Sequence, residues 1–372
     1  MDEARAPAPT RRWARPPARS VLALVAALAA TGALVAQTPE KPRGPEPRPP
    51  AVGTVWPQAG RADVPGVLTD GAPYNPAFFV DERVSAGIAV GADGKTVRLV
   101  LRAADGTVRV LRQLAAATGP QFAAFIRVGE QLVWAETVTG RDGTAQTTLW
   151  RADLSGGTPR KITDDTGWVT FAGSDYDMVV NADRLYWTAT ASGDQQATEV
   201  RSVPLDGGPV NVRTQPGEWT LSRWPWLVSP SSDARLLNVD TAQVVKVPAD
   251  GARLGQCGPT WCRLYTLSDD GPTRIELIRP DGSERLRLAD SGATASLVDV
   301  APLDRFEVLS NDSTTLGAAL GGQQLLVYDL KTRRSVLVAE AATSVSYRAG
   351  VLWWSTSALG RNSWHTLDLR TV

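Results

Sequence analysis

The sequence contains one histidine and two cysteines among 372 residues, and this shortage excludes several kinds of site. A zinc or copper site built from several imidazoles is excluded within this chain, because His365 is the only histidine. A Ser-His-Asp triad could use only His365, and Asp368, three residues later, would lie on the opposite face of a strand. We therefore expect a structural role for His365, and the sequence predicts no cofactor and no metal site.

The chain also lacks an excess of charge of either sign. Lys plus Arg and Asp plus Glu each number 39, and the isoelectric point is about 6.6. A protein that binds nucleic acid through its phosphates usually carries a basic surface. The sequence also has neither a Walker loop nor the glycine fingerprint of a dinucleotide site at a strand-to-helix turn. We therefore expect no nucleic-acid partner and no nucleotide cofactor.

The N-terminal part carries an export signal. Several arginines between residues 11 and 19 precede an apolar run from Val21 to Ala36. This run is close to the roughly 17 residues that span a thin bilayer, which favours an uncleaved anchor. A cleaved signal peptide is the alternative, although cleavage after Ala36 would leave Leu34 where a small residue is preferred. Either way the basic flank stays in the cytoplasm and the rest of the chain is exported.

These patterns divide the chain into four segments. A Pro-rich stretch of mixed charge follows the apolar run and favours extended polyproline II over any packed element. The sequence predicts a single-pass cell-membrane protein with its main domain outside, or a secreted protein if the segment is cleaved. The predicted segments are a cytoplasmic flank (residues 1–20), a signal anchor or signal peptide (21–37), a linker (38–60) and one folded domain (61–372).

The two cysteines predict a structural disulfide. Cys257 and Cys262 flank a Gly258-Pro259 turn that would place two antiparallel strands face to face. A thioredoxin-like redox motif has two residues between its cysteines, whereas this sequence has four and no βαβ pattern around them. A hairpin disulfide also suits an exported protein.

From residue 61 onward the sequence has the pattern of an all-β protein. Short runs rich in Val, Leu, Trp and Thr alternate apolar and polar positions, and Gly, Asp and Pro separate them. The runs group into units of about 40 to 50 residues with four strands each, which is the period of β-propeller blades. We expect seven blades, with six as the alternative. The last unit lacks an outer strand, and we expect Val64 to Asp70 to supply it, because an open sheet edge invites aggregation.

One unit contains two short sequence motifs that resemble those of a known family. Leu185-Tyr186-Trp187-Thr188, followed by Pro204-Leu205-Asp206-Gly207-Gly208, resembles blades of YWTD and TolB-like propellers. The general arrangement is similar to exported or membrane-anchored propeller proteins of actinobacteria. The resemblance implies binding of a protein or peptide through a propeller face, and it carries over no catalytic residue.

Thirteen tryptophans are the main excess in composition. Trp134, Trp187 and Trp353 each end the second strand of a unit, so we expect them to fill the space between wedge-shaped blades. Other tryptophans lie in or beside connections between blades, where they could stack on a sugar or hold a peptide. These are Trp168, Trp219 and Trp224.

Acidic and amide residues gather in the predicted loops that emerge on one face of the propeller. Calcium binding by Asp175 and Asp177 is conceivable, but no dedicated calcium loop is present, so solvated turn residues are favoured. On the same face, the longer loop from Ser310 to Gln323 could cover the opening of the propeller's central channel. The predicted binding-face residues are Trp168, Asp175, Tyr176, Asp177, Asp194, Trp219, Asp269, Asn311, Asp312 and Arg361.

These observations lead to two hypotheses on function. The first is a monomeric, non-catalytic binding scaffold outside the cytoplasm that recognises a protein, peptide or envelope polymer through the loop-rich face. The alternative is a propeller enzyme, a glycan hydrolase or lyase, that uses channel-mouth carboxylates such as Asp175, Asp177 or Asp269 as acid and base. That chemistry needs two carboxylates within about 10 Å of each other.

Overall fold

The structure is a computed structural model that describes residues 48–372, except residues 170, 194–195, 230–234, 269–270, 291–292, 312–320 and 359–360. Residues 49–372 form one compact unit. The predicted cytoplasmic flank, the apolar segment predicted to be a signal anchor or signal peptide, and most of the predicted linker lie outside the described residues. Within the described part of the chain, no helix has the length and hydropathy of a membrane span.

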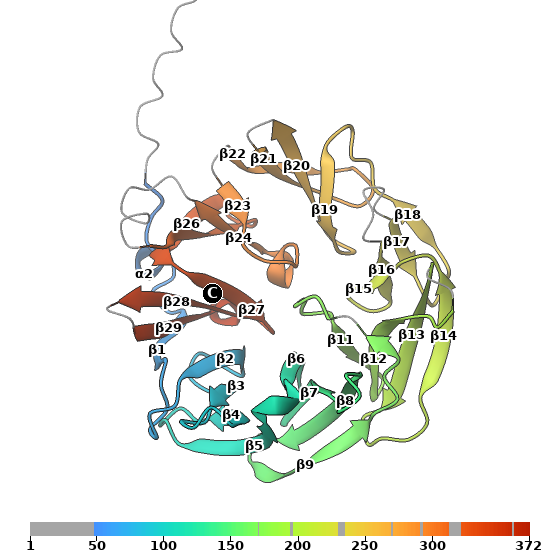
Figure 1. Cartoon of the computed structure of the whole chain (residues 1–372). Coiled ribbons are helices and arrows are strands. Elements are labelled where there is room, and N and C mark those ends of the chain that lie inside the picture. Colours follow the sequence, from blue (N-terminus) through green and yellow to red (C-terminus); the bar gives the residue numbers. More distant parts are fainter. Residues whose placement is uncertain are drawn as a thin grey trace, which may run out of the picture. The chain divides into compact units, whose positions relative to one another are not determined.

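Seven antiparallel sheets surround a central channel in the described residues (Figure 1). The predicted all-β propeller with seven four-stranded blades is therefore confirmed. The strands of the first four blades are β2 (Tyr74–Phe79), β3 (Ser85–Val90), β4 (Thr96–Arg102) and β5 (Val108–Ala115); β6 (Gln121–Val128), β7 (Gln131–Thr139), β8 (Ala145–Asp153) and β9 (Gly156–Thr163); β10 (Trp168–Val169), β11 (Met178–Asn181), β12 (Arg184–Thr190), β13 (Ala197–Pro204) and β14 (Asn211–Pro216); and β15 (Thr220–Leu221), β16 (Trp226–Val228), β17 (Arg235–Asn238) and β18 (Val244–Lys246).

The last three blades complete the ring. Short 3-10 helices η1 (Ala116–Thr118), η2 (Pro302–Asp304) and η3 (Leu369–Thr371) lie in the connections and at the C-terminus. The strands of these blades are β19 (Arg253–Cys257), β20 (Cys262–Ser268), β21 (Gly271–Ile278) and β22 (Arg285–Asp290); β23 (Ala293–Ala295), β24 (Phe306–Asn311), β25 (Gln323–Asp329) and β26 (Arg334–Ala342); and β27 (Ser344–Arg348), β28 (Val351–Ala358), β29 (Arg361–Asp368) and β1 (Gly60–Pro65).

The core consists of apolar layers between neighbouring blades, and tryptophans fill them. Trp134 and Trp187 are completely buried and Trp353 nearly so. Trp134 packs with residues of blades 1 and 2, Trp187 with blades 2 and 3, and Trp353 with blades 7 and 1. The predicted wedge role of these three side chains is confirmed. Each such ring buries about 150–250 Å² of surface, which makes it a main source of stability.

The N-terminal strand closes the ring, as the truncated last unit predicts. Strand β1 pairs antiparallel with β29, so that Gly60 faces Asp368 and Pro65 faces Ser363. The strand lies earlier than the expected segment from Val64 to Asp70. The reason is a turn at residues 68–72, where the Leu68 amide bonds to the Ala72 carbonyl and the Ala72 amide to the Asp70 carboxylate.

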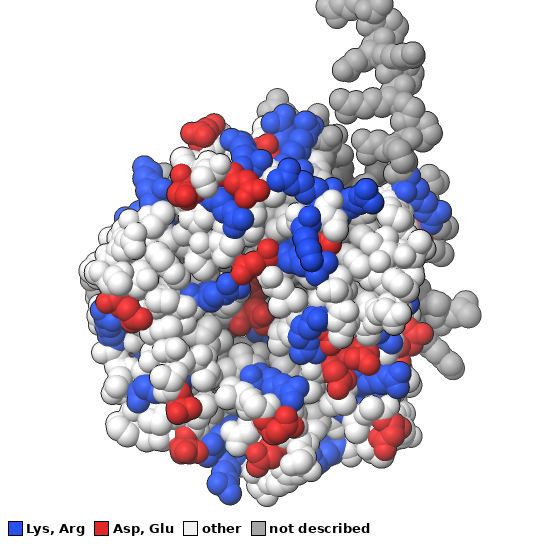
Figure 2. Space-filling view, turned by 180° about the vertical axis from the view of Figure 1, so that it is seen from behind, with Lys and Arg blue, Asp and Glu red and all other residues white. Residues whose placement is uncertain are grey.

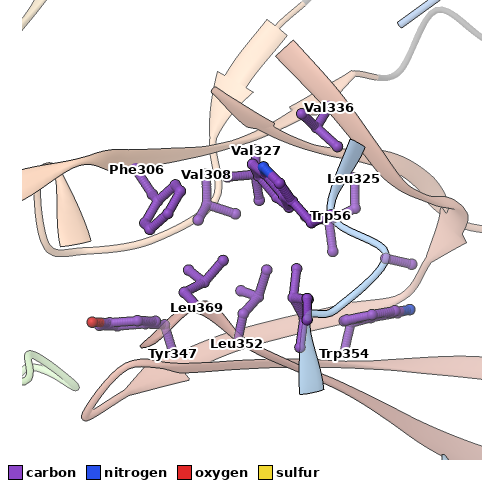
Figure 3. Close-up of a cluster of buried hydrophobic side chains, with 13 residues drawn as sticks. Trp56, Phe306, Val308, Leu325, Val327, Val336, Tyr347, Leu352, Trp354 and Leu369 are labelled. Carbon is purple, nitrogen blue, oxygen red and sulfur yellow. The ribbon is translucent and has the colours of Figure 1, made fainter. Parts of the chain in front are cut away.

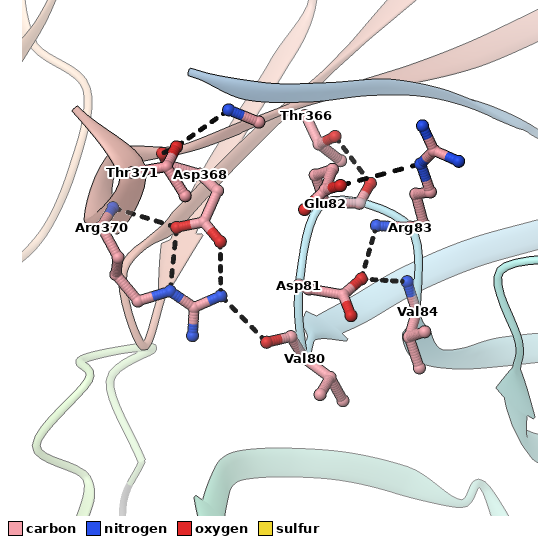
Figure 4. Close-up of polar contacts among 10 residues, drawn as sticks. Val80, Asp81, Glu82, Arg83, Val84, Thr366, Asp368, Arg370 and Thr371 are labelled. Carbon is pink, nitrogen blue, oxygen red and sulfur yellow. Dashed lines mark hydrogen bonds and ion pairs between the residues drawn. The ribbon is translucent and has the colours of Figure 1, made fainter. Parts of the chain in front are cut away.

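Polar contacts lock blade 7 to blade 1 at this closure (Figure 4). The guanidinium of Arg370 donates to both oxygens of Asp368, at 2.8 and 2.7 Å, and also to the carbonyl of Val80 at 2.9 Å. The hydroxyl of Thr366 donates to the Glu82 carbonyl at 2.8 Å. The carboxylate of Asp368 thus has a matching cation in Arg370.

The segment just before β1 also packs on the propeller. A single helical turn, α2 (Val52–Val55), leads to Trp56, whose ring meets Phe306 edge-on at 5.7 Å. Figure 3 shows Trp56 among buried side chains of blades 6 and 7, including Val327 and Leu352. The last part of the predicted linker is therefore held against the domain.

The predicted disulfide is confirmed. Cys257 ends β19 and Cys262 begins β20, and their sulfur atoms are bonded at 2.07 Å. The two residues also face each other in the strand pairing, so the bond fixes the turn between them.

Candidate functional site

The inner strand of blade 3 is interrupted by a loop that enters the channel. Strands β10 and β11 both pair with β12, where Val169 faces Ala189 and Met178 faces Trp187. The chain between Val169 and Met178 therefore stands opposite a single residue of β12, Thr188. We call residues 171–177 the plug loop.

Asp177 gives the plug loop its shape. One carboxylate oxygen of Asp177 accepts a hydrogen bond from the Ala172 amide and the other from the Gly173 amide, each at 2.9 Å. The Asp177 amide donates to the Ser174 carbonyl at 3.1 Å. Gly173 has a φ of 80°, a left-handed conformation that glycine adopts without strain. The loop is therefore closed on itself by a carboxylate rather than by a strand ladder.

Four hydrogen bonds fix the plug loop to the far side of the channel. The hydroxyl of Ser174 and the amide of Asp175 donate to the two oxygens of Asp299 in blade 6, at 2.5 and 2.6 Å. In blade 7, Arg348 donates to the Ser174 carbonyl at 2.8 Å, and the Ala349 amide donates to the Asp175 carboxylate at 2.9 Å. In Figure 1 this loop runs from blade 3 into the middle of the ring. The plug loop thus bridges the channel from blade 3 to blades 6 and 7.

Burial raises the pKa of the carboxylates at the bridge. The pKa of Asp175 rises to about 6, first because burial disfavours its charged form and further because of the charges of Asp299 and Asp177. The Ala349 amide and Arg348 act in the opposite direction. Desolvation is also the main cause of the raised pKa of Asp177 and of Asp299. Three carboxyl groups thus share a site in which ionisation is costly.

A buried ion pair holds the loop that carries Asp299. The guanidinium of Arg263 donates to Glu307 at 2.6 Å and to the Asp299 carbonyl at 2.7 Å. The second oxygen of Glu307 accepts from the Ala301 amide at 2.8 Å. Arg263 is 3% exposed and Glu307 is fully buried. Such a pair does little for net stability, but removal of one partner leaves a buried charge without compensation.

A cavity of about 300 Å³ lies in the channel beside the plug loop. Its wall combines apolar side chains, such as Leu297, Val345 and Trp353, with the polar groups of Asp299 and Arg348. Gly173 of the plug loop forms part of the same wall. Figure 2 shows the face opposite to that of Figure 1, with acidic side chains in a central hollow and basic side chains around it. A cavity with apolar walls and a few polar groups at one end is typical of a small-ligand site.

The structure brings together some of the predicted site residues. Asp175, Tyr176 and Asp177 lie together in the plug loop, which connects β10 and β11 within blade 3 rather than two blades. Trp168 is 79% exposed at the start of β10, whereas Trp219 is buried and its indole nitrogen bonds to the Pro216 carbonyl.

Other predicted site residues lie elsewhere or outside the described residues. Asn311 ends β24, paired with β23 and β25. Asp194, Asp269 and Asp312 lie outside the described residues, as does the side chain of Arg361.

Sequence reasoning missed the partners of the plug loop. Asp299 sits between Val298 and Val300 in a stretch that reads as apolar, and Arg348 follows a strand pattern. The plug loop and these residues are more than 120 positions apart in the sequence. No local sequence motif predicts that the plug loop contacts Asp299 and Arg348.

His365 has two hydrogen-bond partners, although none is evident near it in the sequence. Its Nδ1 lies 2.7 Å from Asp63 of β1, and its Nε2 lies 2.9 Å from the hydroxyl of Thr356. The closure strand supplies Asp63, which explains why it was not found near His365 in the sequence. The order hydroxyl, imidazole, carboxylate is that of a hydrolytic triad, but the Asp63 side chain is 85% exposed. We interpret the chain of hydrogen bonds as a tie between β1 and blade 7.

Similarity to solved structures supports the fold. No family model and no curated protein matches this sequence. A puromycin-hydrolyzing peptidase of Mycobacterium tuberculosis matches 80% of this chain and 51% of its own, with 14% identity and a TM-score of 0.51. The propeller domain of the Trilobed protease of Pyrococcus furiosus matches 65% of this chain and 80% of its own, with 11% identity and a TM-score of 0.43. A TolB-like protein of Agrobacterium tumefaciens matches 70% of this chain and 94% of its own, with 15% identity and a TM-score of 0.40.

These comparisons correct the first functional hypothesis. A non-catalytic binding scaffold was expected because the chain carries no evident catalytic set. The puromycin-hydrolyzing peptidase of Mycobacterium tuberculosis, an enzyme, contains a part with the fold of this chain. This chain spans about half the length of that enzyme. The lack of a catalytic set in a propeller is therefore no argument against an enzyme, and the scaffold hypothesis is withdrawn.

Proposed function

We propose that this chain is the propeller of a peptide-hydrolysing enzyme and that its channel receives the peptide. The observation that carries the proposal is the cavity of about 300 Å³ beside the plug loop. The similarity of fold to a peptidase supports it. Because the chain spans about half of that peptidase, we place the groups that cleave the peptide outside the described propeller.

The cavity has the chemistry to hold a short stretch of peptide. Apolar walls formed by Leu297, Val345 and Trp353 would bury a side chain, and each buried methylene contributes about 0.8 kcal/mol. Asp299 and Arg348 at the polar end offer an acceptor and a donor for backbone amide groups. The plug loop forms one wall, so the cavity suits a chain end or a loop better than a threaded polymer.

The test uses the full chain and synthetic peptides of graded length. Binding is measured by isothermal titration, and hydrolysis by mass spectrometry after addition of the native envelope fraction. Ser346→Trp fills the cavity from β27 and should reduce peptide binding by tenfold or more. Ser155→Trp, on an exposed turn of blade 2, is the matched control and should bind as the wild type does. Equal binding by both variants, or no binding by the wild type, would contradict the proposal.

A second candidate function is cleavage of a glycan by the chain itself. The observation that favours it is the meeting of Asp175, Asp177 and Asp299, where Asp175 has a pKa of about 6. A carboxyl group with a raised pKa can act as a general acid near neutral pH. Purified full chain would then release sugars from envelope polymers, and Asp175→Asn would abolish the release. Retention of hydrolysis in that variant, or none in the wild type, excludes this candidate.

The cellular location rests on the sequence alone. We propose that the N-terminal segment exports the propeller and keeps it attached to the membrane. Mass spectrometry of the protein from the membrane fraction should find peptides from residues 1–36. A mature protein that starts after Ala36 would indicate secretion, and recovery of the protein from the cytosol would contradict export.

A further inference from the structure

The plug loop can leave its seat without loss of a strand. Strand β10 keeps its pairs with β12 at Trp168 and Val169, and β11 keeps its pairs from Met178 to Asn181. Movement of residues 171–177 therefore breaks no strand pairing, but it breaks the packing of Phe171 and Tyr176, the ion pair of Asp177 with Arg348 and the four hydrogen bonds to blades 6 and 7. Three of these four bonds end on a carboxylate, that of Asp175 or of Asp299.

The groups that face the plug loop carry an excess of negative charge. Arg348 lies 3.6 Å from Asp177 and also bonds to the loop backbone. The charge of Arg263 is balanced by Glu307, so Arg263 adds no further positive charge to offset the carboxylates at the plug. Beyond Tyr176, Arg223 pairs with Asp304 at 2.6 Å. The titratable and charged groups that surround the loop are Asp175, Tyr176 and Asp177 on the loop itself, Arg223 in blade 4, Arg263 in blade 5, Asp299, Asp304 and Glu307 in blade 6, and Tyr347 and Arg348 in blade 7.

This arrangement makes the seat of the loop depend on protons. Asp175, Asp177 and Asp299 all lie within one largely buried cluster, and Arg348 is the cation closest to it. With all three ionised, the closed state holds like charges at short range with little water to screen them. When the loop moves out, the carboxylates on it return to water. Protonation therefore stabilises the closed state relative to the open one.

We propose that residues 171–177 are a plug that seals this mouth of the channel at acidic pH and is released as the pH rises. The plug acts on the channel whatever the channel carries, so the inference is independent of the peptidase proposal. A protein exposed outside the cytoplasm would thereby open its channel in neutral or basic surroundings.

The sign and size of the effect follow from Asp175. Its pKa is about 6 with the plug seated, and 3.8 is the ordinary value for a carboxyl in water. The proton is therefore bound more tightly in the closed state, and the opening equilibrium rises with pH through about 6. For Asp175 alone the opening constant should increase about tenfold between pH 5 and pH 8. Asp177 and Asp299 have raised pKa values as well, so they act in the same direction.

Hydrogen exchange of two backbone amides tests the proposal on the full chain. The Asp175 amide donates to the Asp299 carboxylate and the Ala349 amide donates to the Asp175 carboxylate, so both bonds cross from the plug to its seat. After correction for the intrinsic pH dependence of exchange, their protection should fall about tenfold from pH 5 to pH 8. Protection that is independent of pH overturns the proposal.

Two variants make the result specific. Asp175→Asn keeps the oxygen that accepts from the Ala349 amide but cannot ionise, so both amides should stay protected at pH 8. Asp142→Asn is the matched control, because Asp142 is an exposed turn residue that bonds to the Thr144 amide. It should show the wild-type pH dependence. The same pH dependence in Asp175→Asn as in the wild type overturns the role of Asp175.

Discussion

The ring closure and the plug loop both join segments that are distant in the sequence, but they use different chemistry. At the closure, β1 and β29 form a ladder of backbone hydrogen bonds, and the carboxylate of Asp368 meets the guanidinium of Arg370 (Figure 4). At the plug, no ladder crosses the channel. Side chains and single amides carry the contacts there, and most of them depend on Asp175 and Asp299.

The difference separates a permanent joint from a conditional one. Backbone pairs and matched charges keep their strength between acidic and neutral pH, so the closure should behave as part of the core. Buried carboxylates in excess over cations depend on their protonation state. The same fold thus contains a joint that holds the ring and a joint that can be released. The predictions below test this contrast, from the largest expected effect to the smallest.

The closure should fail most severely when its apolar filling is removed. Trp364 of β29 is buried, and its indole donates to the Tyr74 carbonyl of blade 1 at 3.0 Å. Trp364→Ala should lower the free energy of unfolding by about 3–5 kcal/mol, because it leaves a cavity and an unpaired carbonyl. Urea unfolding followed by fluorescence measures the loss. Trp168→Ala is the control, since that side chain is 79% exposed and should change stability by less than about 0.5 kcal/mol.

The seat of the plug depends on the buried ion pair in blades 5 and 6. Arg263→Met leaves Glu307 buried without its cation and should lower the free energy of unfolding by about 3 kcal/mol. The double variant Arg263→Met/Glu307→Met removes both charges and should regain most of that loss. A double variant as unstable as the single one would show that packing, not charge, accounts for the effect.

Neutralising the plug should stabilise the protein, in contrast to both changes above. Because the pKa of Asp175 is raised on folding, its contribution to stability is present below about pH 4 and is lost as the pH rises through about 6. Asp175→Asn should therefore raise the free energy of unfolding at pH 8 by about 2–3 kcal/mol and leave it unchanged at pH 4. Urea midpoints at the two pH values check this. A variant less stable than the wild type at pH 8 would refute the sign.

The smallest effect is expected at the exposed tie between β1 and blade 7. His365→Gln removes the bond to Asp63, whose side chain is largely in water. The change should cost less than about 1 kcal/mol, as exposed pairs usually do. A larger loss in the same unfolding assay would mean that this tie, rather than the ladder, holds the closure.

The sequence predicts the closure well and the plug poorly, for a physical reason. Blade repeats, inter-blade tryptophans such as Trp187, and a last unit without an outer strand are all local patterns. Strand β1 was placed a few residues late because the turn around Asp70 is set by contacts that composition does not reveal.

The plug depends on contacts that exist only after the ring has closed. Asp299 lies in an apolar stretch and Arg348 ends a strand, so neither position in the sequence predicts that the residue binds the plug loop. Asp175 and Asp177 were found as an acidic group, but their partners lie in blades on the far side of the channel. Local periodicity carries no information on such a meeting.

The contrast between the two joints is tested most directly by one exchange experiment on the wild-type chain at pH 5 and pH 8. It compares the amides of Asp175 and Ala349 at the plug with the amides of the β1–β29 ladder at the closure. We predict that plug amides lose about tenfold of their protection at pH 8, while ladder amides keep theirs after correction for intrinsic rates. Equal changes at both places, or none at the plug, would contradict the account.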